Sequence, residues 1–169
     1  MDHLEEMVGS DKKIIRAMPN TPAMVGQAMS ALVKNDQITD DDLVEVDKIF
    51  KCIGKTQLID ESMMDAVIGV SGSSPAYVFM FIEAMADAAV LSGMPRDQAY
   101  QFAAQAVYGS AKMVMETGLH PGVLKDMVCS PRGTTIRAVE VLEEHGFRNA
   151  VIKGQLACVK RSKEMSQER

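Results

Sequence analysis

The residues with the clearest capacity for chemistry lie in one short stretch, Val128-Cys129-Ser130-Pro131-Arg132-Gly133-Thr134-Thr135-Ile136. The pattern predicts a loop that runs into the first turn of a helix, with Ser130 as the cap and Pro131 at a first helical position. Gly133 lets a ligand approach the backbone closely. Free N–H groups and the dipole at a helix start favour an anion, so the stretch predicts a site for a small carboxylate or phosphate. The same pattern is also typical of an ordinary capped helix that binds nothing.

The elements that position this stretch are helical, because apolar residues recur at helical spacing from Ser62 onward. Glycine and proline divide this part of the chain into segments. The expected helices span residues 62–70, 75–91, 97–116, 121–128, 134–145 and 147–167.

The helix expected from Pro75 to Leu91 is apolar on nearly all sides. Its only charges, Glu83 and Asp87, are four residues apart and therefore share one face. A surface helix of a monomer has a wider polar face, so a second subunit is the expected cover. The two acids make the helix a poor candidate for a membrane span.

Residues 1–60 are expected to form a small β-β-α-β unit. The strands are expected at residues 13–18, 28–33 and 56–59, and the helix is expected to start after the N-cap Thr39 and to end at Gly54. The segment is too small to be a complete dinucleotide-binding domain. In addition, no Gly-x-Gly-x-x-Gly motif follows a strand. The predicted class is therefore mainly α, with a helical domain at 61–169 preceded by a sheet remnant at 1–60.

Composition narrows the classes of function. The chain has 169 residues and a net charge of −5, which argues against a nucleic-acid partner. Its three cysteines are widely spaced, so they predict free thiols of a cytoplasmic protein rather than zinc ligands or disulfides. No secretory signal is expected, because acids occupy the first residues. The three histidines lie in polar or terminal contexts, so neither a metal site nor a catalytic histidine is expected.

Residues 121–143 closely resemble the signature segment of pyrroline-5-carboxylate reductases. The segments Arg16-Ala17-Met18-Pro19-Asn20-Thr21-Pro22-Ala23 and Gly72-Ser73-Ser74-Pro75-Ala76-Tyr77 resemble two further motifs of that family, at its spacing. The resemblance runs from about residue 14 to about residue 165. It implies that 1–60 is the end of a Rossmann domain and that Met1 is the start of a fragment, with a natural short form as the alternative.

The resemblance implies reduction of 1-pyrroline-5-carboxylate, a cyclic imine, to L-proline with NADPH or NADH. It implies a homodimer, often assembled further into rings, with active sites where the nucleotide domain meets the partner's helices. The substrate carboxylate would be held by Ser130, Gly133, Thr134 and Thr135. We expect the isolated chain to be inactive, because the main cofactor site is absent.

The resemblance also assigns individual roles. Thr135 would lie near the ring nitrogen, as a hydrogen-bonding or water-relay group rather than a strong acid. Glu61 would stabilise an iminium ion. Pro75 and Val128 would shape the nicotinamide site, and Asn20 would line the cofactor crevice. Without the resemblance, each of these residues has an ordinary structural interpretation: a first-turn threonine, a first-turn acid, a helix-starting proline, a core valine and a turn asparagine.

Two residues depart from the family pattern, since Arg132 and Ser74 both stand where a glycine is usual. Arg132 would add a cation beside the anion site, which would either strengthen carboxylate binding or obstruct it. Two alternative functions also remain open at this point. One is a non-catalytic helical oligomerisation module, and the other is a reductase of a related imino or keto acid.

Overall fold

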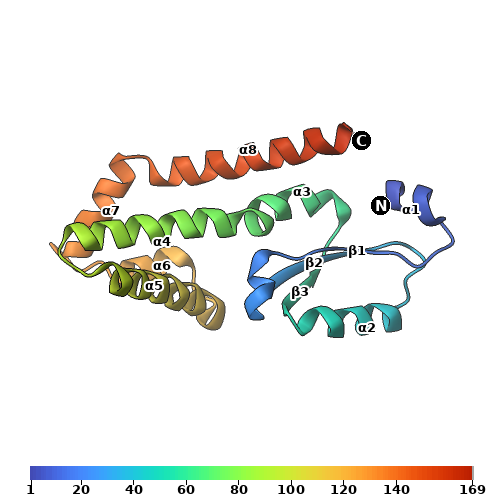
Figure 1. Ribbon diagram of the computed structural model, residues 1–169, viewed down its shortest axis with the longest axis horizontal. Coiled ribbons are helices and arrows are strands. Elements are labelled where there is room, and N and C mark those ends of the chain that lie inside the picture. Colours follow the sequence, from blue (N-terminus) through green and yellow to red (C-terminus); the bar gives the residue numbers. More distant parts are fainter. Residues whose placement is uncertain (169) are drawn as a thin grey trace. The chain divides into compact units, whose positions relative to one another are not determined.

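The computed structural model describes residues 1–168. The chain forms two compact units (Figure 1). The first unit contains residues 1–76 and the residues from Gly154 onward, and the second contains Tyr77–Lys153. The predicted helical domain, 61–169, therefore contributes residues to both units.

The first unit is built around a three-stranded sheet. Its strands are β1 (Ile15–Met18), β2 (Ala28–Lys34) and β3 (Gly54–Leu58), in the order β1-β2-β3. β1 runs antiparallel to β2, with Ile15 opposite Lys34, and β2 runs parallel to β3, with Leu32 opposite Leu58. The β-β-α-β prediction is confirmed, with strand ends shifted by one or two residues.

Strand β2 supplies most of the buried core of the first unit, through Ala28, Ala31, Leu32 and Val33. Helix α2 (Asp40–Lys51) connects the two parallel strands, as a parallel pair requires a crossover. Leu43 of the helix and Leu32 of β2 line the same small hollow, so the helix packs on the sheet.

The start of α2 is as predicted, but its end is not. Thr39 caps the helix in a capping box, accepting from the Asp42 amide at 3.3 Å while Asp42 accepts from the Thr39 amide at 2.9 Å. The expected end at Gly54 is wrong, because the helix stops at Lys51. Gly54 instead opens β3 with φ +153°, and a Cβ there would lie 2.2 Å from the Ala28 carbonyl oxygen. Tertiary contact with β2 therefore explains this glycine.

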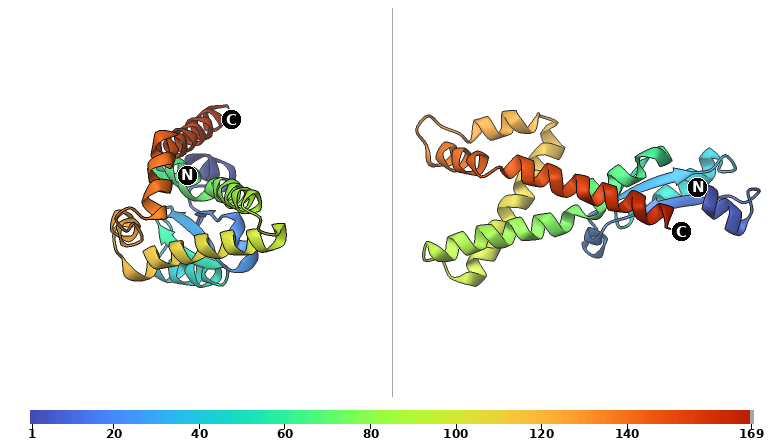
Figure 2. Two further views of the ribbon diagram at one scale, coloured as in Figure 1. Left: turned by 90° about the vertical axis from the view of Figure 1, so that its left-hand side faces the viewer. Right: turned by 90° about the horizontal axis from the view of Figure 1, so that it is seen from above.

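The helix predicted at 62–70 is divided into three short turns. These are a 3₁₀ turn η2 (Glu61–Met63), an α-turn α3 (Met64–Val67) and a π-turn η3 (Ile68–Gly72). The last part of α8 (Phe147–Gln167) packs on them, as Figure 2 also shows. A Cβ on Gly69 would lie 2.8 Å from the Val159 side chain, and Ser162 Oγ donates to Asp65 at 2.6 Å.

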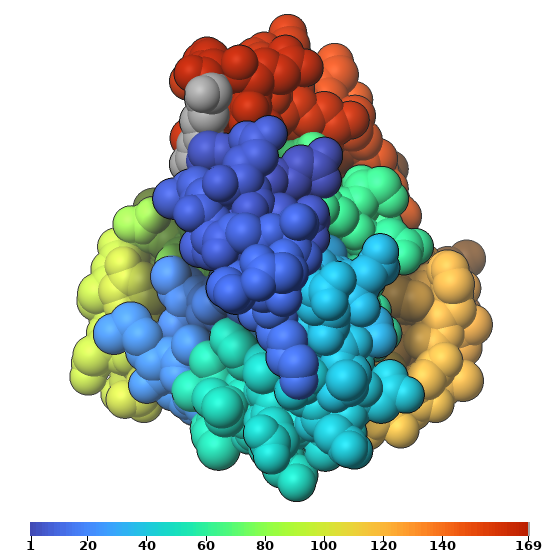
Figure 3. All heavy atoms as spheres, turned by 90° about the vertical axis from the view of Figure 1, so that its right-hand side faces the viewer, coloured from blue at the N-terminus to red at the C-terminus, as the bar shows by residue number. Residues whose placement is uncertain are grey.

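Two short helices complete the first unit: α1 (Asp2–Val8), which lies beside the last turns of α8, and the 3₁₀ turn η1 (Thr21–Val25) (Figure 3). The second unit contains α5 (Arg96–Thr117), α6 (Pro121–Met127), α7 (Thr134–Glu144), most of α4 (Ser74–Leu91) and the start of α8. The predicted order and approximate ends of these helices are confirmed.

Helices α4 and α5 bury small residues and leave large apolar side chains exposed. The buried alanines are Ala86, Ala99 and Ala103. The exposed apolar side chains of the two helices include Phe79, Met80, Phe102, Tyr108 and Met115. Phe79 is 63% accessible and Met80 is 68% accessible. By length and composition alone, the helical run from Glu61 to Leu91 is sufficient to cross a membrane, and 6% of its most apolar window is buried.

Candidate functional site

The loop between α6 and α7 is a tight turn. The Gly133 amide donates to the Ser130 carbonyl at 3.0 Å, which closes a four-residue turn with Pro131 and Arg132 at its centre. Arg132 has φ +60°, and proline followed by a positive φ is the pattern of a type II turn. Glycine is the residue best suited to that second position, so the usual family glycine has a conformational reason here.

This turn corrects part of the prediction. Ser130 does not cap α7, and Pro131 is not its first residue, because the helix starts at Thr134. The N-cap is Gly133, with φ −74° and ψ 167°, and it has no side chain to cap with. Because the chain turns at Arg132, α7 starts at Thr134, which is three residues later than the expected start at Pro131.

The four predicted substrate residues lie close together in sequence, Ser130 and Gly133 in this turn and Thr134 and Thr135 at the start of α7. Gly133 and Thr135 are partly buried, whereas Ser130 and Thr134 are exposed. The first amides of a helix have no partner within it. Within residues 1–168, the amides and hydroxyls of Thr134 and Thr135 bond to no protein group. These donors are available to an anion, whereas the Gly133 amide is already used.

Ser130 and Gly133 approach each other closely. A Cβ on Gly133 would lie 2.3 Å from Ser130 Oγ and 3.1 Å from the Ser130 carbonyl oxygen. Only a glycine therefore leaves the Ser130 hydroxyl where it is. Val128, just before the turn, is 62% accessible and is not a core valine in this chain.

Glu61 lies in the first unit and is paired with two cations. Its Oε1 accepts from Arg16 Nη1 at 2.8 Å and from the N-terminal amine of Met1. Partial burial alone would raise the pKa of Glu61, but these hydrogen bonds outweigh it and hold the pKa below its ordinary value. Arg16 is 45 residues away in sequence, so no local pattern predicted this partner.

Asn20 links two segments of the first unit. Its Oδ1 accepts from the Met29 amide at 3.0 Å, and its Nδ2 donates to the Ser71 carbonyl at 3.2 Å. Pro75 is the second residue of α4, four residues after Ser71. Ser74 Oγ donates to the Val70 carbonyl at 2.7 Å, an internal bond that a glycine does not make.

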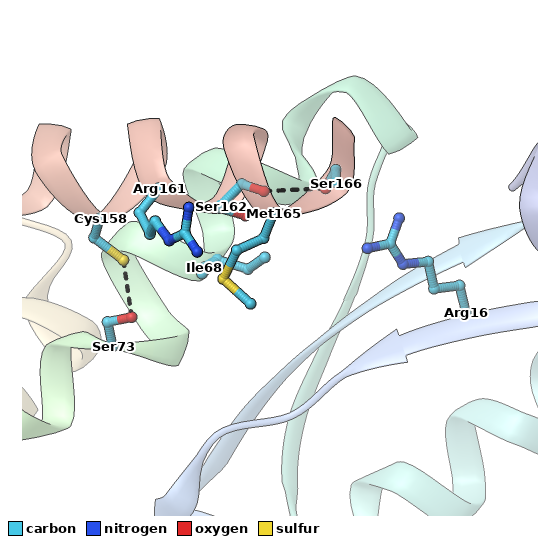
Figure 4. Close-up of a pocket in the computed structure, with 8 residues that line it drawn as sticks. All are labelled: Arg16, Ile68, Ser73, Cys158, Arg161, Ser162, Met165 and Ser166. Atoms are coloured by element: carbon cyan, nitrogen blue, oxygen red, sulfur yellow. Dashed lines mark hydrogen bonds between the residues drawn. The ribbon is translucent and has the colours of Figure 1, made fainter. Parts of the chain in front are cut away.

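A cavity of about 410 Å³ in the first unit was not anticipated from the sequence (Figure 4). It lies between β1, η3 and α8, where Ser73 and Cys158 are 3.0 Å apart. Its two arginines are both paired with acids, Arg16 with Glu61 and Arg161 with Glu168 at 2.9 Å. Among the described residues that line it, no positive charge is therefore left unbalanced to attract an anion.

The predicted residues thus fall into two groups. Asn20, Glu61 and Pro75 belong to the first unit, and Val128 with the Ser130–Thr135 turn belongs to the second. Among residues 1–168, no three His, Cys, Asp or Glu side chains are grouped so as to hold a metal ion.

Comparison with known proteins gives consistent results. Residues 61–165 match the family model "Pyrroline-5-carboxylate reductase dimerisation". Escherichia coli (strain K12) pyrroline-5-carboxylate reductase is 63% identical over 166 residues, which are 98% of this chain and 62% of that protein. The Arabidopsis thaliana protein of the same name is 48% identical over 99% of this chain and 60% of its own length. The chain thus spans about 60% of the length of these curated relatives.

Solved structures agree with these sequence matches. A Plasmodium falciparum pyrroline carboxylate reductase, determined with NADP bound, has a TM-score of 0.91 and 36% identity. The alignment covers 98% of this chain and 66% of that one. A Coxiella burnetii pyrroline-5-carboxylate reductase has a TM-score of 0.90 and 34% identity, covering 95% and 60%.

Proposed function

Because the chain belongs to the pyrroline-5-carboxylate reductase family, we propose that the whole protein reduces 1-pyrroline-5-carboxylate to L-proline with NADPH or NADH. This reaction is the last step of proline biosynthesis. The relatives are enzymes of that name, and this chain corresponds to about 60% of their length.

The observation that carries the proposal is the set of unused donors after the Ser130 turn. A carboxylate placed there would accept from the amides of Thr134 and Thr135 and from neighbouring hydroxyls. Neutral donors at a helix start bind an anion without needing a buried cation. Gly133 allows the Ser130 hydroxyl to stay close to these donors, because any Cβ at residue 133 would displace it.

Thr135 and Glu61 are proposed to act on the nitrogen end of the substrate. Thr135 is partly buried, and among the described residues its hydroxyl bonds to no protein group, so it is free to bond to the ring nitrogen or to a water. Glu61 would stabilise the positive charge of the iminium ion. The hydrogen bond from Arg16 favours the ionised form of this carboxylate, but the arginine also compensates its negative charge. We therefore propose that Glu61 and Arg16 together stabilise the iminium ion.

A nicotinamide cofactor supplies the hydride when it is bound. The residues proposed to contact it here are Asn20, Pro75 and Val128. The glycine-rich motif that holds a pyrophosphate at a helix start does not occur in the 169 residues. We therefore propose that the isolated chain does not turn over NAD(P)H.

The partner proposed for the second unit is another copy of the chain. Its helices α4 and α5 expose large apolar side chains, and the matched family segment is a dimerisation domain. We propose that the dimer, rather than a membrane, covers this surface, and that dimers assemble further into rings. A cytoplasmic location, suggested by the free cysteines, is part of the same proposal.

Ligand-induced stabilisation tests the carboxylate site. Millimolar proline is expected to raise the thermal unfolding midpoint of this chain, because it binds only the folded state. Gly133→Val is expected to abolish the rise, since its side chain would displace Ser130. An unchanged midpoint with proline in the unmodified chain would favour a non-catalytic oligomerisation module. A whole protein that prefers a different imino or keto acid would indicate a related reductase.

A further inference from the structure

Helix α6 starts with an uncommon cap. His120 is its N-cap, and its Nδ1 accepts a hydrogen bond from the Gly122 amide at 3.0 Å. His120 has φ −58° and ψ 133°, the extended conformation that a following proline favours and that an N-cap requires. Pro121 occupies the first helical position, where its missing N–H is not needed.

Gly122 makes room for the imidazole. A Cβ on Gly122 would lie 3.0 Å from His120 Nδ1 and 3.3 Å from its Cε1. An alanine there would force the ring to shift by a few tenths of an ångström, which disturbs its bond to the amide it caps. The three residues His120, Pro121 and Gly122 therefore work together, each for a different physical reason.

The cap lies ten residues before Ser130, and helix α6 occupies most of the chain between them. Helix α6 has only seven residues, and so short a helix is marginal on its own. At its far end the Val128 amide donates to Lys125 and the Cys129 amide to Asp126, and the Ser130 turn follows directly. The start of α6 thus helps to fix where this turn begins.

We propose that His120 is a positioning residue for the Ser130–Thr135 loop, and that it acts in its neutral form through the cap on α6. The inference rests on the function proposed above. Nδ1 must be unprotonated to accept from Gly122, so the neutral ring carries its proton on Nε2. Protonation of Nδ1 would replace the acceptor by a donor facing another donor, and would place a positive charge at the positive end of the helix.

No other charged group takes part in this cap among residues 1–168. The charged residues nearest in sequence on the flanking helices are already paired, Glu116 with Lys112 at 3.5 Å and Lys125 with Asp126. No ion pair joins His120 to any of them. The cap therefore consists of the imidazole and the Gly122 amide.

The test measures the affinity of this chain for proline, whose carboxylate stays ionised from pH 8 to pH 5.5. The unmodified chain is expected to bind about fivefold more weakly at pH 5.5, the factor expected for loss of one helix cap. His120→Asn keeps an acceptor that does not titrate, so it is expected to bind equally at both pH values. His120→Ala is expected to bind about fivefold more weakly at both. Gly122→Ala retains the histidine but crowds its ring, so it should also weaken binding, by no more than His120→Ala does.

His3→Asn is the matched control, because it removes a histidine on α1 and leaves the cap intact. It is expected to keep the pH dependence of the unmodified chain. In nitrogen-15 NMR spectra at pH 8, His120 is expected to show the form that carries its proton on Nε2. The chemical shift of the Gly122 amide, which donates to Nδ1, is expected to change on acidification.

Either of two results overturns this inference alone: His120→Ala binding like the unmodified chain, or His120→Asn showing the same pH dependence as it. Absence of binding by the unmodified chain at any pH overturns the proposed function first, and this inference with it.

Discussion

Replacing Gly133 by alanine is expected to weaken proline binding by displacing the Ser130 hydroxyl. The new Cβ would lie 2.3 Å from Ser130 Oγ, so the hydroxyl must rotate away from the proposed carboxylate. A hydrogen bond to a charged group contributes about 1.5–3 kcal/mol, which corresponds to a factor of roughly 10 to 100 in Kd. The fold should survive, because φ −74° and ψ 167° are ordinary for alanine.

A double-mutant cycle isolates the cause. Ser130→Ala removes the same hydroxyl without adding a Cβ, so it should weaken binding by a similar factor. The double variant Gly133→Ala, Ser130→Ala should then bind no more weakly than Ser130→Ala alone. Gly154→Ala is the control, since a Cβ there meets nothing within 4 Å. Isothermal titration with proline measures the Kd of the unmodified chain and of the four variants, and circular dichroism checks folding.

Two results would refute this reasoning. If the two losses add fully in the double variant, Gly133 and Ser130 act separately and the close approach has no role in binding. If Gly133→Ala binds like the unmodified chain, Ser130 Oγ is not a ligand of the carboxylate.

Three further predictions follow from single features of the structure. Arg132→Gly should raise the free energy of unfolding by about 1 kcal/mol, because φ +60° disfavours arginine more than glycine; a lower urea midpoint would contradict this. Hydrogen bonds from Lys13 and Thr39 lower the pKa of Asp42 from 3.8 to about 2. Its stabilising contribution should be complete above pH 4 and lost as the pH falls towards 2, and Asp42→Asn should flatten this part of a urea-midpoint profile. Phe79→Glu should convert dimers to monomers in analytical ultracentrifugation. Ile49→Glu should not, because Ile49 is also exposed but lies outside the matched dimerisation segment.

Features that depend on neighbours in sequence were predictable. The Thr39 capping box lies within four residues, and the helices after residue 74 are separated by prolines and glycines that end or start them. The β-β-α-β order followed from periodicity and turn residues in the same way. The composition of the candidate loop was also evident, because Ser130, Gly133, Thr134 and Thr135 are nearly adjacent.

The geometry of that loop was not predictable from spacing. A Ser-Pro pair suits either a helix start or a turn, and the left-handed conformation of Arg132 decided for the turn. Likewise, a histidine before Pro-Gly carries no strong capping signal, yet the structure places its Nδ1 on the Gly122 amide.

The sequence by itself therefore determined the order of elements, the family and the residue types available for chemistry, since these are local properties of the chain. Only the tertiary structure decided that Arg16 meets Glu61, that Gly54 fits against Ala28 and that Gly69 fits against Val159. These contacts join residues 26 to 90 positions apart, and their formation depends on how packed elements bring distant side chains together rather than on any local pattern.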